Sequence, residues 1–208
     1  MHCLLQYDAG DEGNVQSMNS ANSYETHAHE YLDVRDGTNT GACIVAHWAK
    51  ALPVGVDVIE IACGGGYPVS RVLVDAGVRV WAIEASPTLL ERFCLRFPGV
   101  PAQCSLALES DYFGRKFGAA ISIGLLFLLE ETEQIKLLHR VSEILLPDGR
   151  FLFTAPIEVG TWRDTVTGCE CRSLGRARYV QILEDAGFYL VGTHVDEGNN
   201  NHYEARKQ

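Results

Sequence analysis

The feature that most limits the possible fold is a regular alternation of short apolar runs with longer amphipathic runs, which starts after Pro53. The runs at 56–62 and 78–84 are short, apolar and rich in Val and Ile, which is typical of buried strands. Each is followed by a run with helical spacing, at 68–77 and 86–97. Strands that alternate with helices in this way form βαβ units, in which the strands lie parallel. The sequence therefore predicts an α/β fold.

The alternation continues to the end of the chain. It predicts further strands near 100–105, 117–129, 149–157, 188–195 and 202–207, with helices over 131–145 and 174–187. Only the short turn EGNNN joins the last two strands, so the final strand is expected to lie antiparallel. We predict a Rossmann-like sheet of about seven mostly parallel strands, with helices on both faces.

The first part of the chain has a different character. Residues 1–20 contain several Gly, Asn and Ser and few large apolar side chains, which predicts a flexible leader. Two helical runs, 23–33 and 38–52, precede the first strand. No repeat or second apolar core is present, so we expect a single domain over 21–208, with lid helices over 21–52 and a core over 53–208.

Composition limits the class of ligand. Apolar residues make up 47% of the chain and charged residues 21%, as in a soluble globular protein. The formal net charge is −10, and the 17 Lys and Arg residues are scattered rather than clustered. Such a surface repels phosphate backbones. These observations disfavour a nucleic-acid partner and favour a small-molecule one; no pattern bears on the oligomeric state.

Cysteine usage and hydropathy bear on location. The seven cysteines are odd in number and irregularly spaced, which favours free thiols in a reducing compartment. The start MHCLLQYDAG lacks the pattern of a signal peptide, and no stretch approaches eighteen consecutive apolar residues. We expect a cytoplasmic protein with no membrane association. The C-x-C pair Cys169 and Cys171 is too weak a pattern to predict a metal site.

The chemistry is indicated by a glycine-rich loop, Cys63–Gly66, directly after the first strand. Glycines at this place let the backbone approach a nucleotide-type ligand, and the next helix offers unpaired N–H groups. The Walker pattern is absent because no Gly-Lys-Ser/Thr follows. The dinucleotide fingerprint needs Gly or Ala where this chain has Val69, which makes a dehydrogenase a weaker alternative.

The loop resembles the first motif of the class I S-adenosylmethionine-dependent methyltransferases, in which an acidic residue is followed, two or three residues later, by G-x-G. Here the acidic residue is Glu60. The resemblance extends over about 23–208. It implies that Glu60 organises the loop near the amino group of the cofactor, and that the methionine and ribose are bordered by the loop backbone of Ala62, Cys63, Gly64 and Gly66.

Further positions match the same family. Glu84 closes the second strand about twenty residues after the loop, where a carboxylate can accept hydrogen bonds from both ribose hydroxyls, with Ala85 beside it. Where the family often has an acidic residue near the adenine, this chain has Cys104 and Ser105. The resemblance also implies cofactor contacts at Gly124 and Leu125, at the end of the fourth strand, and at Tyr24 and Arg35 in the lid, with Arg35 pairing with the methionine carboxylate.

The acceptor pocket is expected beyond the carboxyl ends of the strands, because ligands of open α/β sheets bind there. The loop after the fifth strand and the final hairpin supply the candidate substrate-binding residues, joined by one from the lid: Trp162, Arg163, Asp164, Asp196, Tyr203 and Tyr31. His202 or His194 is a candidate general base, since neutral imidazole is available near neutral pH.

Together these patterns predict an S-adenosylmethionine-dependent methyltransferase. Its methyl group would pass to an O or N atom of a small molecule by in-line displacement, and S-adenosylhomocysteine would be the product. Such a reaction requires positioning and exclusion of water more than a reactive side chain. The alternatives are an NAD(P)-dependent oxidoreductase with an atypical glycine loop and a protein that binds S-adenosylmethionine without turnover.

Overall fold

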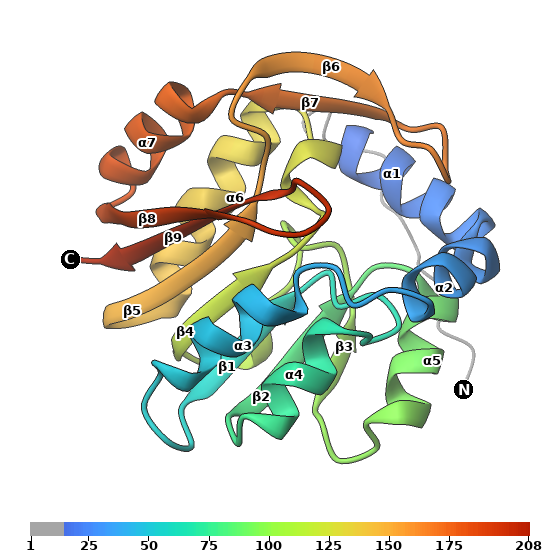
Figure 1. Ribbon diagram of the computed structural model, residues 1–208, viewed down its shortest axis with the longest axis horizontal. Coiled ribbons are helices and arrows are strands. Elements are labelled where there is room, and N and C mark those ends of the chain that lie inside the picture. The colour runs from blue at the N-terminus through green and yellow to red at the C-terminus, as the bar shows by residue number, and fades with distance from the viewer. Residues whose placement is uncertain (1–14) are drawn as a thin grey trace.

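A seven-stranded sheet forms the centre of the molecule (Figure 1). The structure is a computed structural model and describes residues 15–208. The strand order of the sheet is β3-β2-β1-β4-β5-β9-β8. The five strands from β3 to β5 are parallel, whereas β9 lies antiparallel to both β5 and β8. The strands are β1 (Asp57–Ile61), β2 (Arg79–Glu84), β3 (Ala102–Cys104), β4 (Phe117–Ser122), β5 (Leu145–Thr154), β8 (Phe188–Val195) and β9 (Asn201–Lys207). The predicted α/β sheet with an antiparallel last strand is confirmed.

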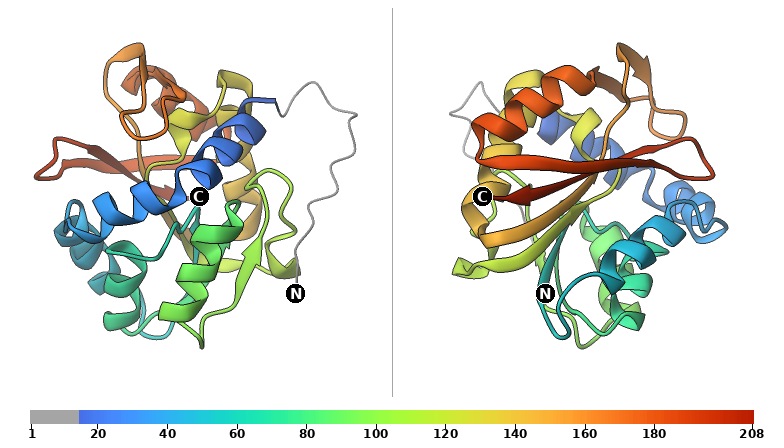
Figure 2. Two further views of the ribbon diagram at one scale, coloured as in Figure 1. Left: turned by 90° about the vertical axis from the view of Figure 1, so that its right-hand side faces the viewer. Right: turned by 60° about the vertical axis from the view of Figure 1, so that its left-hand side comes forward.

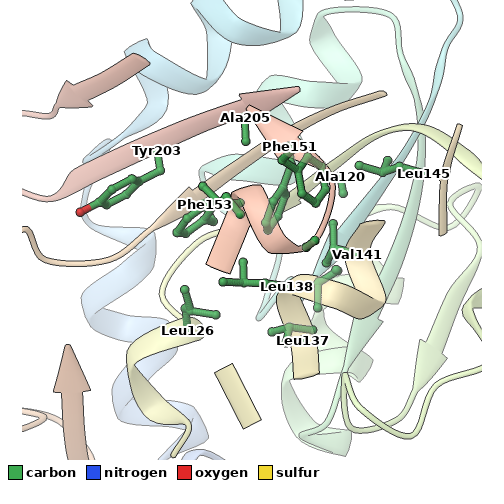
Figure 3. Close-up of a cluster of buried hydrophobic side chains, with 14 of the residues drawn as sticks. Ala120, Leu126, Leu137, Leu138, Val141, Leu145, Phe151, Phe153, Tyr203 and Ala205 are labelled. Carbon is green, nitrogen blue, oxygen red and sulfur yellow. The ribbon is translucent and has the colours of Figure 1, made fainter. Parts of the chain in front are cut away.

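Helices cover both faces of this sheet. On one face, α3 (Ala42–Lys50), α4 (Val69–Asp75) and α5 (Pro87–Arg96) pack on β1 and β2. On the other face lie α6 (Glu131–Ile144) and α7 (Arg176–Asp185), over a core in which Phe151 and Phe153 of β5 are fully buried (Figure 3). Within residues 15–208, no helix is both long enough and apolar enough to cross a membrane.

Two further helices, α1 (Val15–Thr26) and α2 (Ala28–Asp36), run one after the other across the carboxyl ends of the parallel strands (Figure 2). Residues 15–20 of the expected leader form the start of α1, and residues 1–14 lie outside the described part. Tertiary contacts hold this polar helix. The Ser20 hydroxyl donates to the Leu128 carbonyl at 2.9 Å, and the Glu25 carboxylate accepts the Thr88 amide at 3.1 Å.

A second sheet, which the sequence analysis treated as a loop, follows β5. Strands β6 (Val159–Arg163) and β7 (Glu170–Leu174) pair antiparallel and lie beside α1 (Figure 1). The hairpin is tied to α1 by a hydrogen bond from the Gln16 side chain to the Glu170 carbonyl, 3.2 Å long. All of β6 is exposed, so the apolar alternation that marks a half-buried strand is missing.

The glycine loop after β1 is tightly enclosed. A β-carbon at Gly65 would lie 2.3 Å from Cδ2 of Leu32 in α2, and one at Gly66 would lie 2.3 Å from Cε2 of Phe97, which follows α5. Both distances are too short for atomic contact, so a side chain at either position would force Leu32 or Phe97 to move. Ala62 starts the loop with φ of 62°, in the left-handed region, although it carries a β-carbon.

We expect the substitution Ala62→Gly to stabilise the protein. The left-handed conformation costs an L-residue about 1–2 kcal/mol, whereas the greater freedom of glycine in the unfolded chain costs only about 0.5–1 kcal/mol. Urea unfolding should show a net gain of roughly 0.5–1 kcal/mol. Ala120→Gly, in the part of β4 that pairs in register with Ile59 and Phe151, is the control and should lose stability. A similar loss in both variants would contradict the explanation.

Candidate functional site

A cavity of about 240 Å³ lies between the carboxyl ends of the parallel strands and the two N-terminal helices. Its floor comes from the segments that follow β1, β2, β3 and β4, and its roof from α1 and α2. Eleven of the residues predicted for the site line it: Tyr24, Tyr31, Arg35, Ala62, Gly64, Glu84, Ala85, Ser105, Gly124, Leu125 and Asp196. The chain therefore brings residues from the lid, the glycine loop and three strand ends to one cavity.

Glu84 ends β2 and holds the glycine loop against it. Its Oε2 accepts a hydrogen bond from the Gly64 amide at 2.8 Å, and its Oε1 accepts one from the Ser86 amide at 2.9 Å. Burial raises the pKa of this carboxyl, and the two amide hydrogen bonds oppose that rise. Because a carboxylate has about four lone-pair sites, Glu84 can still accept hydrogen bonds from a ligand in the cavity.

Glu60 is buried and does not line the cavity. Its Oε2 accepts a 2.6 Å hydrogen bond from the Ser70 hydroxyl, so it joins β1 to α4 beneath the glycine loop. Burial raises the pKa of Glu60 to about 8. The hydrogen bond from Ser70 and the positive charge of Arg35 limit this rise, while the charge of Glu84 adds to it.

Three other predicted cofactor residues also lie off the cavity wall. Cys63 is buried against α5, where desolvation holds the pKa of its thiol well above the ordinary value. Gly66 faces Phe97 and lets the loop pack closely. The Cys104 thiol is directed at the carbonyl of Ala85, 3.8 Å away. These residues shape the loop and the strand ends that border the cavity.

Three lid residues stand over the glycine loop. The rings of Tyr24 and Tyr31 meet edge to face, 5.3 Å apart, and a β-carbon at Gly64 would lie 3.2 Å from the Tyr31 hydroxyl. Burial raises the pKa of Tyr31 to about 12, although the charge of Arg35 opposes that rise. Tyr31 is thus a neutral hydrogen-bond donor, and Arg35 is the cation at this end of the cavity.

The two candidate bases do not line the cavity. His202 is completely buried, and its Nε2 donates to Oδ2 of Asp196 at 2.9 Å. Burial alone would raise the pKa of Asp196, but hydrogen bonds from His202 and Asn200 outweigh it and lower the pKa. The half-exposed His194 lies 3.7 Å from Glu204. His202 therefore fixes the turn that carries Asp196, rather than reaching into the cavity.

The remaining predicted substrate residues also lie outside the cavity wall. Tyr203 is buried in the core, stacked on Phe153 with ring centroids 5.0 Å apart (Figure 3). Arg163 is exposed and donates to the carbonyl of Gly168. Asp164 shapes the β6–β7 turn by accepting the Thr167 amide at 2.7 Å. Trp162 packs against Phe127, which does line the cavity.

Several wall residues were missed by the sequence analysis. Ser17 and Ser20 fall in the segment expected to be flexible, and Ala21 is the first residue of the predicted lid segment. Phe127 and Leu128 fall in the apolar run 117–129, which was interpreted as one strand. In the structure the strand ends at Ser122, and Leu126–Leu128 form a short 3-10 helix beyond it. Within residues 15–208, no group of three or more His, Cys, Asp or Glu side chains is arranged to hold a metal ion.

The raised pKa of Glu60 predicts a pH-dependent stability. Between about pH 4.5 and pH 8 the folded chain keeps a proton on Glu60 that the unfolded chain has lost, so rising pH favours unfolding. Glu60→Gln stays neutral and keeps a hydrogen-bonding oxygen for Ser70. Relative to this variant, the unfolding free energy of the wild type should fall by up to about 1.4 kcal/mol per pH unit. Urea titrations across this range, with Glu184→Gln as control, test this. Parallel wild-type and Glu60→Gln curves would contradict it.

Neither protein-family models nor curated proteins match this chain. Solved structures do. The chain is similar to the 1,6-didemethyltoxoflavin-N1-methyltransferase of Burkholderia thailandensis, with a TM-score of 0.77 and 18% sequence identity. The similarity covers 100% of this chain and 98% of that enzyme. The chain is also similar to the magnesium protoporphyrin IX methyltransferase of Synechocystis PCC 6803, with a TM-score of 0.73 and 14% identity, over 97% of this chain and 100% of that enzyme. An amino pentose methyltransferase of Micromonospora echinaspora is similar with a TM-score of 0.66 and 16% identity, over 81% of this chain and 90% of that enzyme. The chain therefore has the fold of the class I S-adenosylmethionine-dependent methyltransferases.

Proposed function

We propose that this protein is an S-adenosylmethionine-dependent methyltransferase that transfers a methyl group to an O or N atom of a small molecule. The observation that carries the proposal is Glu84. Its carboxylate ends β2, fixes the Gly64 amide and still faces the cavity. A carboxylate at this place is suited to the paired hydroxyls of a ribose. The three structural neighbours described above, whose names describe small-molecule methyltransferases, support the same function.

The other polar groups of the cavity fit the same cofactor. S-adenosylmethionine combines a ribose, an adenine, a sulfonium and an amino acid group. Arg35 is suited to its carboxylate, and the backbone carbonyl groups of Ala62 and Gly64, two residues that line the cavity, are suited to its ammonium group. Ser105 and Leu106, after β3, provide a polar and an apolar wall for the adenine. The rings of Tyr24 and Tyr31 are suited to lie against the sulfonium.

The bound cofactor would supply an electrophilic methyl group, and the chain would supply position and exclusion of water. Closure of the site depends on how α1 and α2 are held. Glu25 of α1 accepts hydrogen bonds from the Ser86 hydroxyl and from the amide and hydroxyl of Thr88, at the start of α5. Arg96 of α5 pairs with Asp36 of α2. These contacts clamp the roof of the cavity onto α5.

We expect the substitution Glu84→Gln to weaken S-adenosylmethionine binding. The amide group would offer one acceptor oxygen where two are needed for Gly64 and Ser86, and would turn an N–H toward one of those donors. Calorimetry should show at least about a tenfold loss of affinity for S-adenosylmethionine and S-adenosylhomocysteine. Glu91→Gln, at an exposed position of α5, is the control. NAD binding by the wild type without a response to S-adenosylmethionine would overturn the proposal.

Removal of the clamp should open the roof without unfolding the core. We expect Glu25→Ala to increase hydrogen–deuterium exchange in α1 and α2 while exchange in β1 and β4 stays unchanged. The affinity for S-adenosylmethionine should fall by about threefold to tenfold, because ordering the loosened lid on binding costs free energy. Glu30→Ala, at an exposed position of α2, is the matched control. Unchanged exchange in α1 would show that Glu25 is not needed to hold it.

A further inference from the structure

The cavity has two chemically different halves. The carboxyl ends of β1, β2 and β3 carry the glycine loop, Glu84 and Ser105, which the proposed function assigns to the cofactor. The other half lies over the ends of β4 and β5, under α1 and the segment 125–129. Its wall is mainly apolar, with Ala21, Leu125, Phe127 and Leu128. If the cofactor occupies the first half, the methyl acceptor lies in this second half.

The charged groups of the cavity leave this half without a free charge. Arg35, Glu84 and Asp196 are the only charged side chains on the wall formed by residues 15–208. Glu84 belongs to the cofactor half because it accepts the Gly64 amide at 2.8 Å, and the proposed function assigns Arg35 to the carboxylate of the cofactor. Asp196 lines the cavity beside Gly41, where a β-carbon would lie 3.3 Å from its Oδ2, but its carboxylate is already saturated by its own turn. Oδ1 accepts the amides of Gly198 and Asn200, each at 2.9 Å, and Oδ2 is bonded to His202.

One aromatic pair forms the outer wall of the second half. Phe127 lines the cavity, and Trp162 of β6 packs against it from outside with ring centroids 5.5 Å apart. Tyr24 of α1 also lines the cavity, and its ring meets that of Tyr31 edge to face. Its hydroxyl has no hydrogen-bond partner among residues 15–208. The half therefore offers a ring face that a second ring supports from behind.

We propose that the second half binds an uncharged, planar aromatic or heteroaromatic acceptor, stacked on Phe127 with Trp162 behind it. This inference rests on the proposed function only for the role of the ligand as methyl acceptor. A carboxylate or an ammonium compound would lose hydration in an apolar space where residues 15–208 provide no free counter-charge. A saturated ring of the same size would lose the preferred geometry of aromatic contact.

Three probes of similar size separate these properties: naphthol, which is uncharged and planar; naphthoate, which is planar but anionic; and decahydronaphthol, which is uncharged but not planar. Binding to the full chain is measured by equilibrium dialysis, with and without S-adenosylhomocysteine. We expect naphthol to bind at least about tenfold more tightly than naphthoate and severalfold more tightly than decahydronaphthol.

Two variants test the residue assigned. Phe127→Leu keeps apolar volume but removes the ring, and should weaken naphthol binding about threefold to tenfold while S-adenosylhomocysteine binding stays unchanged. Phe113→Leu is the matched control, because Phe113 also contacts a tryptophan, Trp81 at 5.0 Å, but does not line the cavity. It should leave naphthol binding unaltered.

The outcomes separate this inference from the proposed function. Equal or tighter binding of naphthoate, unaltered naphthol binding by Phe127→Leu, or no binding of any probe would overturn the inference. Naphthol binding that depends on Phe127, together with an absence of S-adenosylmethionine and S-adenosylhomocysteine binding, would support the ring site and overturn the proposed cofactor. S-adenosylhomocysteine binding together with a preference for naphthoate would support the proposed cofactor and overturn the ring site.

Discussion

The arrangement of the site depends on one buried carboxylate. Glu84 accepts the amide of Gly64 on one oxygen and the amide of Ser86 on the other, and so joins the glycine loop to the start of α5. Ser86 in turn donates its hydroxyl to Glu25 of α1 and caps α5 by accepting the Leu89 amide. Loop, helix and lid are therefore connected through the side chains of Glu84 and Ser86. Because Glu84 is buried, loss of its charge would leave two buried amides without a strong acceptor, which is costly.

The sheet and the cofactor half of the cavity could be predicted because they depend on local sequence patterns. Val and Ile runs followed by helical spacing specify βαβ units, and the carboxyl ends of parallel strands meet at one edge of the sheet. The position of Glu84, one strand after the glycine loop, follows from that rule alone. The lid helix α1 could not be predicted in the same way. Its residues are polar, and it is fixed by distant partners such as Leu128 and Thr88.

The second half of the cavity was harder to predict because strand alternation decides which side chains face a pocket. His202 and Tyr203 are adjacent in β9, so they point to opposite faces of the sheet. Tyr203 meets the core ring of Phe153, and His202 meets Asp196 on the other side. Neither faces the cavity. The hairpin β6–β7 left no signal, because β6 is exposed along its whole length and is held by Trp162 and by the Asp164 turn.

Several departures from ordinary sequence rules occur together in the seven residues from Glu60 to Gly66. Within them lie a buried carboxyl with a raised pKa, an alanine in the left-handed region and two glycines with no room for a β-carbon. Each feature costs free energy, so each must be held in place by its surroundings. Leu32 and Phe97 press on the loop from α2 and from the end of α5, and Arg96 donates to the Gly65 carbonyl at 2.8 Å. Because α2 is part of this enclosure, the lid contributes to the shape of the glycine loop as well as to the cover of the cavity.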